Sequence, residues 1–151
     1  MEIIEFYEQN ASDREKYIQQ IDSTDWDAAG YLAWMLRTDS FRSTCGEGSR
    51  VLMLVDGEKL ASFCTLADFD EVKSDEMKPW MGFVYTFPEY RGHRCSGRLA
   101  DYAAELAKQE GFEYLYVSSE ETGLYEKYGF EFVEWTTSVH GYETKVFKRI
   151  L

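Results

Sequence analysis

The segment best suited to binding an anion has the sequence FPEYRGHRCSG and covers positions 87–97. Arg91 and Arg94 lie within it and Arg98 follows it, so three cations gather on a short stretch. A helix that begins near Arg94 would present unpaired backbone N–H groups and the positive end of its dipole, which attract phosphate. Neighbouring glycine and serine residues would let the anion approach the main chain. The composition fits a phosphate-binding turn, and it equally fits a solvated basic turn whose glycines permit tight packing.

Seven consecutive residues of this segment are the candidate contacts for a bound phosphate group. They are Arg91, Gly92, His93, Arg94, Cys95, Ser96 and Gly97. His93 has no second residue at a spacing typical of a metal site or a nucleophilic triad, so we expect it to contact phosphate. A helix N-terminus would lower the pKa of the Cys95 thiol, but the helical spacing of Cys95 with Leu99 and Tyr102 favours packing. No metal site is predicted.

The elements before this segment are predicted from apolar spacing and turn residues. We expect a strand at 3–7, a helix after residue 12, a second helix around 31–36, a hairpin of strands at 51–55 and 60–66, and a strand at 80–86. Ser12 and Glu15 have the Ser-x-x-Glu spacing of a capping box, which predicts where the first helix begins. Asp56 and Gly57 supply the turn of the hairpin.

The elements after this segment complete an alternating order of helices and strands. We expect a helix from about 94, a strand at 112–117, a short helix at 122–128 and strands at 130–136 and 143–150. Gly111 and Gly129 supply C-terminal stops for the two helices. The acidic stretch at 68–76 reads as a loop. This order calls for a mixed sheet covered by helices, with a strand-turn-helix unit at its middle.

Length and charge exclude several classes of protein. A chain of 151 residues can enclose a hydrophobic core, and we expect one domain over residues 1–151. A net charge of −12 repels phosphate backbones and anionic lipids, so neither nucleic acid nor a membrane is an expected partner. The same charge favours cationic small molecules or basic peptides, although it also serves solubility alone. Three cysteines form no disulfide framework, and the N-terminus lacks a secretory signal, so we expect a cytoplasmic protein.

Two motifs together resemble the GNAT N-acetyltransferase superfamily. One is YRGHRCSGRL at 90–99, and the other is LYEKYGF at 124–130, which is similar to the family pattern Leu-Tyr-Glu-Lys-x-Gly-Phe. The family's turn has the form Gln/Arg-x-x-Gly-x-Gly/Ala. That form places Arg91 first, Arg94 at the usual glycine and Ser96 at the final small residue, so two of the three positions depart from it. The two motifs occur in the family's order.

The resemblance extends from about Val51 to the C-terminus and implies an α/β fold. This fold would be a single GNAT-like domain with a mixed, mostly antiparallel sheet of six to seven strands, flanked by about four helices. The implied activity is transfer of an acetyl group from acetyl-CoA, a co-substrate that needs no metal, to a primary amine of a small molecule or peptide. The amine would attack directly in a ternary complex.

The resemblance also implies roles for particular residues. The strand before the turn would pair its exposed backbone at Val84, Tyr85 and Thr86 with the pantetheine arm of the co-substrate. Tyr125 would protonate the departing CoA thiolate, unless it is a packed aromatic residue whose hydroxyl is already bonded. Many relatives carry a glutamate on the same strand, whereas the aligned position here is Trp80.

The base that deprotonates the acceptor amine is left open by the sequence. Met81 and Gly82 follow Trp80 and carry no carboxylate. Glu120 and Glu121 would relay the proton through water, or they serve only the first turn of the short helix. The missing carboxylate and the altered turn leave a non-catalytic acyl-CoA-binding sensor or interaction module as the alternative to an enzyme. A homodimer paired through the C-terminal strands also stays open.

Aromatic residues with nearby acids are candidate contacts for a cationic acceptor, through cation–π and charge attraction. The aromatic candidates are Trp26, Tyr31, Trp34, Trp80 and Trp135, and the acids are Asp68 and Asp70. Packing in the core explains most of these aromatic residues equally well.

Overall fold

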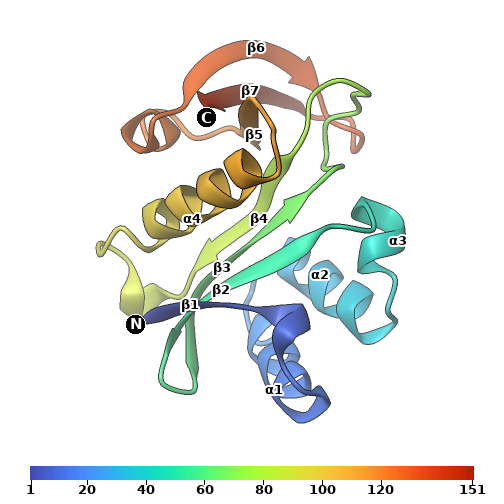
Figure 1. Cartoon of the computed structure of the whole chain (residues 1–151), viewed down its shortest axis with the longest axis vertical. Helices are drawn as coiled ribbons and strands as arrows, with labels where there is room; N and C mark the ends of the chain where they lie inside the picture. Colours follow the sequence, from blue (N-terminus) through green and yellow to red (C-terminus); the bar gives the residue numbers. More distant parts are fainter.

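The computed structural model describes residues 1–151, and its framework is a seven-stranded sheet (Figure 1). The strands are β1 (Glu2–Glu5), β2 (Arg50–Asp56), β3 (Lys59–Ala67), β4 (Trp80–Thr86), β5 (Tyr114–Ser119), β6 (Glu131–Thr137) and β7 (Glu143–Ile150). They lie in the order β1-β2-β3-β4-β5-β7-β6. The β4–β5 pair is parallel and the other neighbouring pairs are antiparallel. The predicted mixed, mostly antiparallel sheet is confirmed.

Four α-helices flank this sheet, as the fold prediction expected. They are α1 (Ala11–Asp22), α2 (Asp27–Arg37), α3 (Phe41–Cys45) and α4 (Cys95–Gln109). Three single 3-10 turns, η1 (Phe6–Glu8), η2 (Pro88–Tyr90) and η3 (Tyr125–Tyr128), complete the elements. Figure 1 shows α4 on one side of the central strands and α1 to α3 on the other. None of the helices combines the length and the apolar character that crossing a membrane requires.

Strand β2 shows why the sequence of the central sheet is so apolar. Val51, Met53 and Val55 belong to the core that α1 and α2 cover, whereas Leu52 and Leu54 belong to the core that α4 covers. All five side chains are buried. Because both faces of the strand are covered, its apolar residues run consecutively and do not alternate with polar ones.

Helix α4 is positioned by a buried stripe of small and branched residues and ends at a glycine. Leu99, Ala100, Ala103 and Ala107 are buried on its inner face. Gly111 has a φ of +91°, and the N–H groups of residues 111 and 112 donate to the carbonyls of residues 108 and 107 at 3.0 and 3.1 Å. This is the Schellman arrangement, so the predicted C-terminal stop is confirmed.

Two local predictions were wrong, and one helix was not predicted. Helix α1 begins two residues earlier than the capping box indicated, because Asn10 is the N-cap and its side chain accepts the N–H of Asp13 at 2.8 Å. Helix α3 was not predicted, since five residues are too short to show a period. The short helix expected at 122–128 is the turn η3 alone.

Candidate functional site

Strands β4 and β5 part after two residue pairs. Trp80 pairs with Tyr116 and Met81 with Val117, and the parallel ladder ends there. From Ser118 onward β5 pairs only with β7 on its other side. The β4 edge that runs from residue 82 to residue 86 therefore has no neighbouring strand, although β3 still pairs with the opposite edge. Val84, Tyr85 and Thr86, predicted to pair with pantetheine, lie on this open edge.

A backbone irregularity marks the point where the strands part. Phe83 has a φ of +48°, which is rare for a residue with a side chain, and the β3–β4 register shifts between Phe63 and Thr65. An extra residue of this kind bends and twists the strand. Left-handed backbone in a bulky residue persists only where the surroundings enforce it, and it is concentrated at functional sites. The bulge therefore points to the open edge of β4 as a candidate site.

The N-terminus of α4 follows β4 and presents three backbone N–H groups. The N–H of Arg98 donates to the carbonyl of Arg94 at 3.1 Å, which is the first bond within the helix. The N–H groups of Cys95, Ser96 and Gly97 precede this bond, so the helix itself supplies them with no acceptor. Arg94 is the N-cap, and its side chain makes no capping bond. The predicted turn thus ends in an arrangement that can hold an anionic oxygen.

Arg94 has the backbone conformation that glycine adopts most easily. Its φ and ψ are 57° and 33°, in the left-handed region. The family pattern has glycine at this position, and the structure shows the backbone reason for that preference. The arginine keeps the glycine-like backbone, so the amides that follow it point as they would after glycine. The departure in sequence therefore leaves the main-chain cradle in place.

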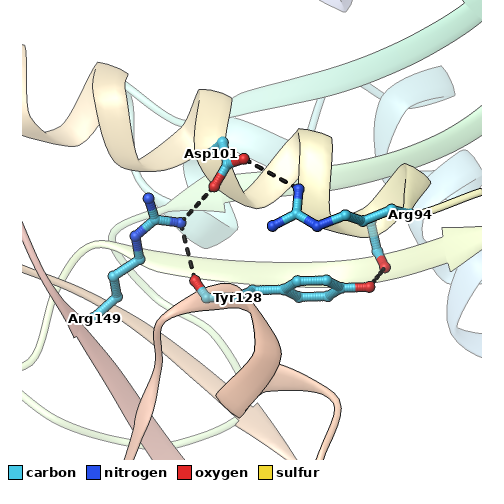
Figure 2. A network of polar contacts seen from close by, with 5 residues as sticks. Arg94, Asp101, Tyr128 and Arg149 are labelled. Atoms are coloured by element: carbon cyan, nitrogen blue, oxygen red, sulfur yellow. Dashed lines mark hydrogen bonds and ion pairs between the residues drawn. The ribbon is translucent and has the colours of Figure 1, made fainter.

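The Arg94 side chain folds back along the first turns of α4, into the network in Figure 2. It bonds to Asp101 at 3.3 Å and lies 5.1 Å from the centre of the Tyr128 ring. Arg149 bonds to the same carboxylate at 2.8 Å and to the Tyr128 carbonyl at 3.1 Å. Burial raises the pKa of Asp101, but these arginine bonds outweigh it and hold that pKa below its usual value. The guanidinium of Arg94 is thus already engaged.

Ser96 and Gly97 fit the same network. The hydroxyls of Ser96 and Tyr128 lie 3.0 Å apart. A Cβ at Gly97 would lie 2.7 Å from a Tyr128 ring carbon and 2.8 Å from Arg94 Cγ, so only glycine fits there. The small residues of the turn are therefore explained in part by packing of α4 against η3, as the alternative prediction held.

The other predicted turn residues lie at the surface or in the core. Arg91, Gly92 and His93 are exposed. Arg91 donates to the carbonyl of Thr86 at 3.0 Å and lies over the Tyr85 ring. Cys95 is buried, and its thiol donates to a backbone carbonyl. Burial raises the pKa of this thiol, which is the reverse of what a reactive cysteine needs, so its side chain packs as the spacing favoured.

A cleft of about 640 Å³ opens where β4 and β5 part. Helix α2, the loop after β3, both parted strands, η3 and the β6–β7 loop supply its walls. Val84 and Tyr125 both line it, so the structure brings together two residues that are 41 positions apart in sequence. None of residues 91–97 lines it. The predicted anion-binding turn and the cleft are therefore separate, and the open edge of β4 connects them.

Tyr125 lies in the wall of this cleft and is buried, with 5% of its surface exposed. Its ring packs edge-on against Tyr128 and Phe130. Burial raises the pKa of its hydroxyl well above the usual value, so the group keeps its proton at neutral pH. A neutral phenol facing a cleft can act as a proton donor.

The charges in the cleft are of one sign. Four carboxylates line it, from Asp27, Asp70, Glu71 and Glu120, together with His140. No lysine or arginine is among the lining residues. Aromatic side chains also line it, from Trp26, Tyr31, Phe69, Phe83, Tyr125 and Tyr142. Carboxylates and aromatic faces together favour a cationic ligand.

Asp70 was named in the sequence only as a nearby acid, and the structure places it in the wall of the cleft. A Cβ at Gly82 would overlap its Oδ1 and lie 3.0 Å from its Cγ. The carboxyl group therefore rests directly against the β4 backbone. Burial raises the pKa of Asp70 to about 7. A glycine at mid-strand was the available signal, because such glycines often mark close approach of another group.

Several other candidates lie elsewhere than predicted. Trp80 is fully buried in the core, whereas Trp34 and Trp135 are exposed outside the cleft. Glu120 and Glu121 do not belong to the first turn of a helix, because η3 begins at Tyr125. No serine or threonine side chain caps η3. No group of three or more potential ligands is arranged to hold a metal ion.

Known proteins match this architecture. The model of the acetyltransferase (GNAT) family matches residues 5–130. Aminoglycoside 6'-acetyltransferase type Ii shares the fold with a TM-score of 0.75 at 15% identity, over 99% of this chain and 97% of that one. An aminoglycoside 6'-N-acetyltransferase complexed with coenzyme A has a TM-score of 0.71 at 13% identity, with the same coverage.

A third solved structure spans both chains completely. Ribosomal-protein-alanine N-acetyltransferase from Brucella melitensis has a TM-score of 0.63 at 16% identity, over 100% of each chain. No curated protein matches the chain in sequence. The family match covers most of the chain, and it includes the parted strands, the turn and Tyr125. The chain therefore belongs to the GNAT acetyltransferase family.

Proposed function

We propose that the protein transfers an acetyl group from acetyl-CoA to a primary amine of a cationic small molecule or peptide. The observation that carries this proposal is the cleft, which joins the open edge of β4 and Tyr125 to four carboxylates and no lysine or arginine. A protonated amine is attracted to such a cleft, whereas an anionic acceptor is repelled. The solved aminoglycoside acetyltransferases of the same fold support an amine acceptor, and the complex with coenzyme A supports the co-substrate.

The co-substrate would follow the path from α4 to the cleft. The N–H groups at the start of α4, in the segment Arg91 to Gly97, would hold its pyrophosphate. The open backbone of Val84 would pair with its pantetheine arm, whereas the carbonyl of Tyr85 already accepts a bond from the hydroxyl of Ser62 at 2.7 Å. The Thr86 carbonyl already accepts a bond from Arg91, so this arginine would fix the edge of the strand beside the pyrophosphate. The thioester would then lie in the cleft beside Tyr125.

The reaction would be a direct displacement. The neutral amine nitrogen forms a bond to the thioester carbonyl carbon, and the carbon–sulfur bond breaks. Tyr125 gives its proton to the departing sulfur, which avoids release of a free thiolate. The reaction would not pass through an acyl-enzyme on Cys45, the cysteine that lines the cleft. Burial and the charge of Asp70 raise the pKa of its thiol to about 11. A thiol of that pKa is not a nucleophile at neutral pH.

Calorimetric titration with acetyl-CoA, followed by an amine screen, tests the proposal. Wild type should bind acetyl-CoA, and Arg91→Ala should bind it more weakly, whereas Arg37→Ala at the end of α2 is the matched control. Release of CoA thiol should be faster with amines that carry a second positive charge than with neutral ones of the same size. Folded protein that does not bind acetyl-CoA would contradict the proposal. Binding without transfer to any amine would favour the acyl-CoA-binding sensor.

A further inference from the structure

The proposed transfer needs a base, and strand β4 supplies none. A primary amine near its normal pKa is mostly protonated at neutral pH and cannot attack until a proton leaves. Trp80 and Met81 are apolar and fully buried, and Gly82 has no side chain. The base must therefore come from another element that reaches the parted strands.

Asp70 reaches this place from the loop between β3 and β4. Its carboxyl group fills the volume that a side chain at position 82 would occupy, since a Cβ there would overlap Oδ1. The same Cβ would lie 3.1 Å from Thr65 Oγ1, so β3 closes the other side of this volume. Gly82 is the first residue of β4 beyond its ladder with β5. We propose, as an extension of the proposed function, that Asp70 is the general base of the acetyl transfer.

The loop that carries Asp70 is fixed on both sides of the cleft. The N–H groups of Asp68 and Phe69 each donate to the carbonyl of Cys45 in α3 at 3.1 Å. On the far side, the Glu71 carboxylate accepts bonds from the hydroxyls of Ser118 and Tyr142.

A backbone bond adds to this second anchor, because the N–H of Val139 donates to the Glu71 carbonyl at 2.7 Å. Asp70 therefore lies between two anchors one residue away on either side. A base held in this way does not have to be ordered when the acceptor binds, which favours the reaction.

The surroundings of Asp70 suit a base at neutral pH. The pKa of Asp70 is raised to about 7, mainly by burial. The hydrogen bond from the N–H of Glu71 opposes this rise, and the negative charge of Glu71 adds to it. Cys45 faces it from α3 and Tyr125 from η3, and both pKa values are raised, so both groups are neutral at pH 7. Strands β3 and β4 present the uncharged Thr65 and Gly82. No lysine or arginine lines the cleft, so neither residue type holds the carboxylate in an ion pair there.

The proton balance then closes with residues of this chain. The acceptor ammonium loses two protons in all as it becomes an amide nitrogen. One proton passes to Asp70 and then to solvent. The other proton replaces the one that Tyr125 gives to the CoA sulfur. That sulfur leaves with the electrons of the broken carbon–sulfur bond. Both residues line the same cleft, so the two transfers occur on one bound substrate.

The test compares Asp70→Asn with Asp75→Asn, a control in the same loop whose exposed side chain does not line the cleft. Asparagine preserves size and cannot accept the proton. With acetyl-CoA and an amine that wild type accepts, Asp70→Asn should lower kcat by about 10²-fold or more, as loss of a general base does, and leave the affinity for acetyl-CoA unchanged. The wild-type rate should rise with pH through about 7. The Asp70→Asn profile should lack this rise, and Asp75→Asn should match wild type.

The outcomes separate the base assignment from the proposed function. Wild-type turnover with an unchanged rate and pH profile in Asp70→Asn would overturn the base assignment and leave the function standing. Binding of acetyl-CoA without transfer to any amine would overturn both. Two amines with well-separated pKa values are used, so that an inflection belonging to the acceptor moves between them and one belonging to Asp70 does not. An inflection that moves fully with the acceptor would also overturn the base assignment.

Discussion

The left-handed backbone of Arg94 predicts an order of stability for its replacements. This conformation costs a residue with a Cβ roughly 1–2 kcal/mol and costs glycine little. Arg94→Gly removes that strain and Arg94→Ala keeps it. Glycine adds roughly 0.4–1 kcal/mol of unfolded-chain entropy relative to alanine, which offsets part of the gain. Arg94→Gly should therefore be more stable than Arg94→Ala by about 1 kcal/mol.

The ion pair does not change this order, because both variants lose it. The side chains of Arg94 and Asp101 are 52% and 51% exposed, so their pairing contributes about 1 kcal/mol at most. Arg94→Gly should consequently lie close to wild type, and Arg94→Ala below it. A difference of 1 kcal/mol corresponds to a shift in Tm of about 2–4 °C for a chain of this length.

Urea unfolding and thermal melting of the two variants measure the difference, and titration with acetyl-CoA adds a functional reading. Arg94→Gly should bind acetyl-CoA about as well as wild type, because the backbone amides remain and the lost guanidinium was engaged with Asp101. An alanine variant as stable as the glycine variant would refute the strain argument. Weak binding by Arg94→Gly would show instead that the guanidinium turns to the phosphate.

Three further changes test the cleft. Tyr125→Phe should lower turnover strongly at unchanged affinity for acetyl-CoA, measured by thiol release and calorimetry, and unchanged turnover would remove its role as proton donor. Gly82→Ala should lower kcat, because the added Cβ overlaps Asp70 Oδ1, and should cost about 1–3 kcal/mol of stability; a fully active variant would contradict the placement of that carboxyl. Stability of wild type relative to Asp70→Asn should fall as pH rises from about 4 to about 7, since burial keeps Asp70 protonated in the folded chain while the unfolded chain ionises. Urea titrations across that range would show a flat difference if the carboxyl were solvated.

Local periodicity made the strand-turn-helix unit predictable. The apolar face of α4 and the stop at Gly111 each depend on residues that are close in the sequence, and the structure has both features. The start of a helix was harder to predict where two nearby residues could each serve as its N-cap. Asn10 and Ser12 are both good N-cap types, and the structure uses Asn10. Helix α3 has too few residues to display any period.

The position of Asp70 in the cleft could not be predicted from local periodicity, because it depends on contacts between segments that are distant in the sequence. Asp70 meets Gly82 only because the loop from 68 to 79 turns back over β4, and that course is set by its bonds to Cys45 and Val139. The acidic composition of this loop by itself predicts a solvent-exposed segment. A glycine in the middle of a strand rich in aromatic residues carried the missing information, yet it does not name the group that approaches it.

The relation between positions 70 and 82 has a consequence for relatives with this fold. A side chain at 82 and the carboxyl of Asp70 compete for one volume, so a chain can have either and not both without moving the loop. A carboxylate reaching the open edge of β4 from the strand itself would serve the same chemistry as one from the loop, because both are desolvated beside the same backbone. The absence of a strand acid here is therefore no argument against catalysis. The missing side chain at position 82 is the condition under which Asp70 can lie where it does.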